Sequence, residues 1–170
     1  MNPTPLILVA ALLPTQAGGG TQPPPKTAHQ HAVEQSGDKA MGFSHEKTTH
    51  HFYLRATGGV IQVDANAASD KESREQIQTH LAHIATMFAK GNFETPMLVH
   101  GVKPPGTASM TKLGALIRYT YEARPQGGRV VITTSDKAAL AAVHEFLRFQ
   151  IQDHATGDPL TVTPEATPSR

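Results

Sequence analysis

The sequence predicts an α+β protein in which an antiparallel sheet, built from two ββα units, carries two main helices on one face. Residues 50–65 and 117–134 each show two short runs rich in β-branched and aromatic residues around a Gly-Gly pair. A helical pattern follows each of them, over 69–91 and 135–157. The segment "GGVIQV" in the first half corresponds to "GGRVVI" in the second, which favours an internal duplication. The alternative explanation is that two unrelated hairpins acquired similar residues because both need them to form.

In the first unit we expect two strands joined at Gly58-Gly59, because glycine tolerates the positive φ of a tight turn. The following helix is expected to start with a capping box made by Ser69 and Glu72 and to end at Gly91. Its apolar stripe is predicted to contain Ile77, Leu81, Ile84 and Phe88.

The second half is expected to contain a short strand ending at His100 and a short helix around 109–116. A second pair of strands then follows. The last helix is expected to begin at Ser135 and to end near Gly157. Its predicted stripe comprises Leu140, Val143, Leu147 and Ile151, with His144 inside it.

Residues 1–17 resemble a signal peptide, because the apolar run 6–13 is too short to span a bilayer and small residues precede a cleavage point after Ala17. The expected location is therefore periplasmic or secreted, without stable membrane insertion after cleavage. Residues 18–40 are rich in Gly, Pro and polar residues and are expected to form a disordered linker. A single domain over 41–160 and a disordered tail over 161–170 complete the prediction.

Composition excludes several classes of function. The net charge is +1, which gives no electrostatic footprint for nucleic acid. Cysteine is absent, which excludes disulfides, thiolate metal sites and covalent haem attachment. Histidine is over-represented, with ten residues in 170, against about 2% in ordinary proteins. This surplus of histidine is the feature that a function must explain.

A transition-metal site is the function that the histidines favour. His80 and His83 lie three residues apart on the expected helix, so their imidazoles project to the same side. Met87 lies one turn further on, and His144 of the other helix and His50 of the first strand are placed to complete a set. Imidazole and thioether donors favour copper, and imidazole also suits zinc. The predicted role is sequestration or delivery of copper or zinc.

Two other classes of function stay open. The first is a binding or interaction module without metal, in which each histidine is satisfied by its own neighbours. The second is a metal-dependent hydrolase, which requires an open coordination position and a general base. No phosphate-binding glycine loop and no G-x-S-x-G motif occurs in the sequence, so no established enzyme signature supports catalysis.

The segments "MGFSHEKTTHHF", "HLAHIATMFAKGNF", "GGRVVITT" and "AVHEFLRFQIQDHATGD" resemble a small group of bacterial, often exported proteins of unestablished function. Some of these carry the name aspartate carbamoyltransferase. The resemblance covers residues 41–160 and implies a compact domain behind an export signal, with no assigned active site. The chain lacks the Ser-Thr-Arg-Thr loop that binds carbamoyl phosphate, so the transferase activity itself is not expected.

Overall fold

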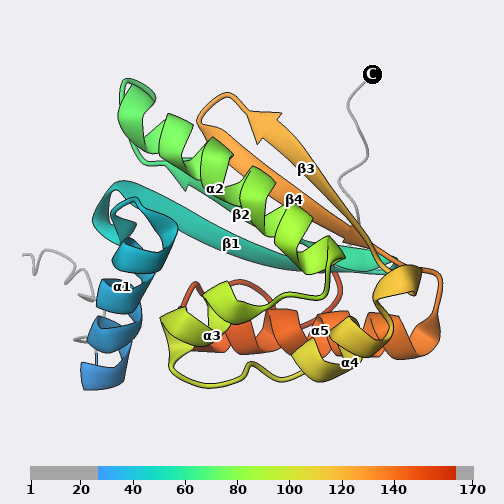
Figure 1. Cartoon of the computed structure of the whole chain (residues 1–170). Coiled ribbons are helices and arrows are strands. Elements are labelled where there is room, and N and C mark those ends of the chain that lie inside the picture. Colours follow the sequence, from blue (N-terminus) through green and yellow to red (C-terminus); the bar gives the residue numbers. More distant parts are fainter. Residues whose placement is uncertain (1–26, 164–170) are drawn as a thin grey trace, which may run out of the picture.

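The computed structural model describes residues 27–163 and contains a four-stranded sheet with helices packed against it (Figure 1). Its elements are, in chain order, α1 (Ala28–Met41), the short 3₁₀ helix η1 (His45–Lys47), β1 (Thr48–Arg55), β2 (Gly58–Ala65), α2 (Lys71–Ala89), α3 (Glu94–His100), α4 (Thr107–Lys112), the 3₁₀ helix η2 (Gly114–Leu116), β3 (Arg118–Arg124), β4 (Gly127–Thr133) and α5 (Lys137–Asp153).

The sheet is antiparallel throughout, with the strand order β1-β2-β4-β3. Each ββα unit contributes one hairpin, and the two hairpins join through β2 and β4 at the centre. Side chains of α2 and α5 pack on the same face of the sheet, where Phe52, Leu54, Val130 and Ile132 are buried. The predicted α+β class, antiparallel sheet and pair of helices on one face are therefore confirmed.

Each main helix packs over the hairpin of the other unit. A Cβ atom added to Gly59 would overlap Leu147 of α5, and one added to Gly128 would lie 3.3 Å from Leu81 of α2. The glycines therefore provide the space in which a leucine from the opposite unit rests on the sheet. Leu81 and Leu147 occupy equivalent positions, ten residues after the first residue of their helices. Because each main helix packs on the hairpin of the opposite unit, the two ββα units have a pseudo-twofold arrangement.

The glycine pairs are not the turns that the sequence predicts. The strand register pairs Arg55 with Gly58 and Arg124 with Gly127, so the turn residues are 56–57 and 125–126. The glycines instead begin the second strand of each hairpin. Close contact between β2 and β4 explains this position, because a Cβ on Gly58 would overlap the Ile132 carbonyl group.

Helix α1 replaces most of the expected disordered linker. Its N-terminus has a reciprocal capping box between Thr27 and Gln30, and Gly42 ends it in the left-handed conformation. The Val33 side chain of α1 is buried, and α1 packs mainly on α3. Residues 28–40 are too polar to fold alone, and contacts with the rest of the domain supply the missing stabilisation. Residues 18–26 lie outside the described part of the chain.

The strand expected before His100 is the helix α3. Pro96 lies in its first turn, where a missing N–H costs nothing, and Gly101 ends it with a φ of 67°. A short apolar run does not distinguish a strand from a buried helix, which explains the error. The short helix expected over 109–116 is present as α4 and η2. The N-caps of α2 and α5 are Asp70 and Asp136, one residue after the serines expected there.

The segment after α5 returns along the outer edge of β1. The Asp158 carboxylate accepts hydrogen bonds from the Phe52 backbone N–H and the His51 ring, both at 2.9 Å. The Thr163 N–H donates to the Leu54 carbonyl at 3.0 Å. Residues 161–163 are thus attached to the domain, in contrast to the expected disordered tail. They cover an edge strand that would otherwise expose unpaired backbone groups.

The expected signal peptide, residues 1–17, lies outside the described residues, as do residues 164–170. Among residues 27–163, no helix combines the length and the hydropathy needed to cross a bilayer.

Candidate functional site

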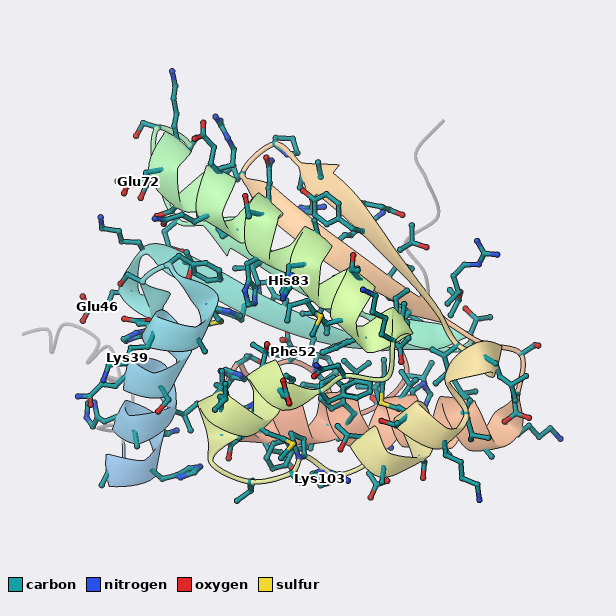
Figure 2. All side chains as sticks on the ribbon, in the orientation of Figure 1. Lys39, Glu46, Phe52, Glu72, His83 and Lys103 are labelled. Carbon is teal, nitrogen blue, oxygen red and sulfur yellow. The ribbon has the colours of Figure 1, made fainter. Side chains whose placement is uncertain are left out.

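Four histidines from four elements line one cavity beneath α2. The cavity has a volume of about 60 Å³ and its walls are mostly apolar. We call it the histidine cavity, and its histidines are His50 of β1, His80 of α2, His100 of α3 and His154 at the C-terminus of α5. Figure 2 shows side chains filling the region between α2 and the layer of α3 and α5, where Phe52, also in the cavity wall, is labelled.

Aromatic rings connect these histidines in a continuous row. His50 stacks on His154 with ring centroids 5.6 Å apart, and His154 meets His100 edge to face at 4.9 Å. Phe43 joins the other end, because its ring lies 5.9 Å from His50 and 5.5 Å from His80. The imidazoles are therefore held by ring contacts, and several ring nitrogens are left available to a ligand.

Three of these imidazoles are neutral at neutral pH. Burial lowers the pKa of His50 and His80 to about 4, and that of His154 to about 3. The neighbouring imidazoles lower these values further, since two positive rings would repel each other. A neutral imidazole has one nitrogen with a free electron pair, which can accept a hydrogen bond or bind a metal.

The Nε2 atom of His50 is buried and has no hydrogen-bond partner. Leaving a buried polar atom unpaired costs about 1–3 kcal/mol, so native structures usually provide a partner. The side-chain nitrogen of Gln150, in the wall of the same cavity, is also unpaired. Two residues that line the same cavity thus each carry a buried side-chain nitrogen without a hydrogen-bond partner.

His100 is fixed by a network that also reaches α1. Its Nδ1 donates to Asp153 at 2.6 Å, and its Nε2 lies 2.9 Å from the Gln150 oxygen. The second Asp153 oxygen lies 2.8 Å from Nε2 of His29 on α1. Burial favours a raised pKa for the Asp153 carboxyl, but the hydrogen bonds from His29 and His100 outweigh it and lower the pKa. Asp153 thus anchors α1 and α3 to α5.

A larger hollow, which we call the vestibule, adjoins the histidine cavity beneath α1. Its volume is about 650 Å³, and its wall includes Glu34 and His45, whose side chains lie 3.1 Å apart. The vestibule and the histidine cavity share three lining residues, Met41, His50 and His154, which we call the neck. All three carry side chains that can bind a soft metal ion.

The structure brings together only part of the predicted metal-binding set. His50 and His80 line the histidine cavity, whereas His83 is exposed on α2 and Met87, although half-buried, is not among the residues that line this cavity. The His144 side chain is buried, and its Nε2–H donates to the carbonyl groups of Arg55 and Gly58 at 2.9 and 3.0 Å. The bond ties α5 to the β1–β2 turn, so His144 is a structural residue away from the cavity.

Two cavity histidines escaped the sequence analysis. His100 was placed at the end of a strand, and His154, near the end of the expected last helix, was not assigned to the site. A signal for His154 was present, because the stripe Val143, Leu147, Ile151 continues to it at the next three-residue step. For His100 no local signal exists, since its partners on α5 are fifty or more residues away.

Within residues 27–163, no three or more His, Cys, Asp or Glu side chains are arranged so that they could hold a metal ion. Comparison of the chain with protein-family models, curated proteins and solved structures gave no match. The resemblance noted from the sequence therefore stays a prediction.

Proposed function

We propose that the protein binds a transition-metal ion, copper or zinc, in the histidine cavity, and that it sequesters or delivers this ion. The observation that carries the proposal is the unpartnered, buried ring nitrogen of His50, in a cavity that it shares with His80 and His154. The pKa values of these histidines leave their electron pairs free for a metal at neutral pH. In the exported compartment predicted from residues 1–17, imidazole and thioether are the ligands that a chain without cysteine can offer to copper.

The first test is a titration of tag-free, full-length protein with Cu(II) and Zn(II) by equilibrium dialysis. A synthetic peptide of residues 18–41, which contains His29 and His31, serves as the reference for nonspecific histidine binding. We expect one ion per chain, bound at least tenfold more tightly than by the peptide. Binding no tighter than that of the peptide would reject the proposal.

Matched variants locate the ion. His50→Phe keeps an aromatic ring in the stack but removes the nitrogens, so it should weaken metal binding at least tenfold. His83→Phe changes an exposed histidine on α2 and should leave binding unchanged. Circular dichroism and thermal unfolding of both variants check that the fold is retained. His80→Phe provides an independent test if His50→Phe does not fold.

A second candidate is a small uncharged organic ligand. The apolar walls and the unpaired Gln150 nitrogen favour it, because an apolar molecule with one hydrogen-bond acceptor would satisfy both. A volume of about 60 Å³ admits only a few non-hydrogen atoms, since a cavity of about 150 Å³ accommodates benzene. Thermal-shift measurements with short-chain amides and alcohols, made in the presence of a chelator, test this alternative.

A further inference from the structure

The two edge strands of the sheet differ in what covers them. The outer edge of β1 is occupied by the segment that follows α5, because Asp158 accepts the Phe52 N–H and the Thr163 N–H donates to the Leu54 carbonyl. By contrast, β3 pairs with β4 alone, and no other segment of residues 27–163 adds a backbone hydrogen bond to it. The N–H and C=O groups of every second residue of β3 therefore point away from the sheet.

Strand β3 lacks three features that often protect an exposed edge. Its pairing with β4 runs from Arg118 to Arg124 without a bulge, and the strand contains neither proline nor lysine. Such features matter because an open edge is a template on which another chain can add a strand. Figure 1 shows β3 at the border of the sheet, on the side away from β1. The edge is therefore suited to pairing with another strand.

The sequence of β3 is complementary to itself when two copies are paired antiparallel. Residues 118–122 read Arg-Tyr-Thr-Tyr-Glu. With a twofold axis at Thr120, each Arg118 lies opposite Glu122 of the partner subunit, and each Tyr119 lies opposite Tyr121 of the partner subunit. The two Thr120 residues lie opposite each other. Opposite charges, aromatic pairs and Thr–Thr pairs are the cross-strand combinations that stabilise antiparallel strands.

The charged side chains of this strand are available to a partner. Arg118 is exposed and forms no ion pair with any of residues 27–163. Glu122 accepts both bonds from Arg129 on one carboxylate oxygen, Oε2, at 2.6 and 2.7 Å. Its other oxygen, Oε1, is left for Arg118 of the partner subunit. Arg118 and Glu122 share one face of the sheet, because side chains alternate along a strand.

On the other face of the sheet, Tyr119 and Tyr121 lie beside α2. Both are half-buried against the core, and the Tyr119 hydroxyl is buried without a hydrogen-bond partner. They line an open hollow of about 540 Å³ together with residues of α2 and its C-cap, which are Ala82, Ala85, Thr86, Ala89 and Lys90. Pairing of two copies brings a second pair of tyrosines to this face, so apolar surface is buried next to the hollow.

We propose that the β3 edge is a dimerisation surface and that its partner is a second copy of this chain, paired antiparallel about a twofold axis at Thr120. The two four-stranded sheets then form one continuous sheet with both α2 helices on the same face. Such a contact uses the same surface on both copies and is closed by its symmetry. The strand does not line the histidine cavity, so this inference is independent of the proposed function.

The test is sedimentation velocity of tag-free, full-length protein over a hundredfold range of concentration, where we expect a monomer–dimer equilibrium. Arg118→Glu puts like charges opposite each other at both ends of the contact and should weaken dimerisation at least tenfold. Glu122→Arg should do the same. An equimolar mixture of these two variants should dimerise again, because the acidic strand of one then lies opposite the basic strand of the other.

Lys103→Glu is the matched control, because it makes the same change of charge at an exposed residue that Figure 2 shows beneath α3 and α5, away from β3. It should dimerise like the unmodified protein, and circular dichroism checks that every variant is folded. A protein that stays monomeric, or a dimer that Arg118→Glu does not weaken, would overturn the inference. A mixture of the two variants that stays monomeric would overturn it as well.

Hydrogen exchange of the unmodified protein gives a second readout that needs no variant. Those amide protons of β3 that point away from β4 should exchange at least tenfold more slowly at the highest concentration than at the lowest. The amide protons of α1 should exchange equally at both concentrations. Exchange in β3 that does not depend on concentration would contradict pairing of this edge with a second copy.

Discussion

Single residues in this protein differ sharply in role although they are of the same type. His144 lies within helix α5, and His154 directly follows its last residue. His144 donates a hydrogen bond to backbone carbonyl groups, whereas His154 lines the histidine cavity. Because a carbonyl oxygen can only accept, the Nε2 atom of His144 carries a hydrogen. The role of each histidine is thus decided by what its ring nitrogens contact.

Replacement of His144 by alanine should destabilise the protein by about 1–3 kcal/mol, because the Arg55 and Gly58 carbonyl groups lose their donor. Urea unfolding measures the change. Metal affinity should stay the same, and His144→Gln, which retains a donor, should recover part of the stability. A loss of metal binding in a folded His144→Ala protein would contradict this assignment.

Glycine 59 should not tolerate even one added methyl group. The Cβ of Gly59→Ala would overlap Leu147 and lie 2.6 Å from the Tyr53 carbonyl oxygen, so we expect a loss of about 1–3 kcal/mol. Gly114→Ala is the matched control, because no atom lies within 4 Å of the added Cβ and φ is not positive. Thermal unfolding should therefore separate the two variants, and equal midpoints would show that α5 does not rest on this strand.

At the level of elements, the long periodic helices and the two hairpins were predictable from the sequence. All four residues of the expected stripe on α2 are buried, and on α5 Val143, Leu147 and Ile151 are buried. Among the short elements, the helix over 109–116 was predicted, whereas α3 was predicted as a strand. Seven apolar and polar residues before Gly101 fit a strand or a helix equally well, and contacts with α1 and α5 decide for the helix α3.

The start of α5 provides a test at this level. Asp136→Ala should cost about 1 kcal/mol, since its carboxylate accepts the Ala139 N–H at 2.8 Å. Ser135→Ala, at the position that the sequence favours as the start, should change the stability by less than about 0.5 kcal/mol. Urea unfolding of both variants determines which residue caps the helix, and a larger effect of Ser135 would reverse the assignment.

At the scale of the whole molecule, the histidine cavity makes stability depend on pH. The unfolded chain binds protons on these histidines near pH 6.5, whereas folded His50, His80 and His154 take them up only near pH 4, 4 and 3. Between these values the unfolded state binds more protons, so stability is lost as the pH falls below 6.5. The slope is about 1.4 kcal/mol per pH unit for each histidine that is charged only in the unfolded state.

Urea unfolding of metal-free protein at pH 7.5, 6.0 and 5.0 measures this slope. The Asp153 carboxyl does not contribute in this range, because its pKa is lowered from an ordinary value of 3.8. His50→Phe should reduce the slope by about 1.4 kcal/mol per pH unit, which is the contribution of one histidine. A stability that is constant from pH 7.5 to 5.0 would show that the cavity histidines are not buried as neutral rings.

The sequence by itself determined the α+β class, the two ββα units and the two main helices, because periodicity and glycine placement act over short stretches of chain. It also indicated that histidine and methionine were the donors available for a metal. Tertiary structure decided which of them meet. His50, His80, His100 and His154 come from four elements, and their convergence depends on how the helices of each unit cross the opposite hairpin. Contacts between residues far apart in the chain leave no local pattern, so only the folded molecule reveals the cavity.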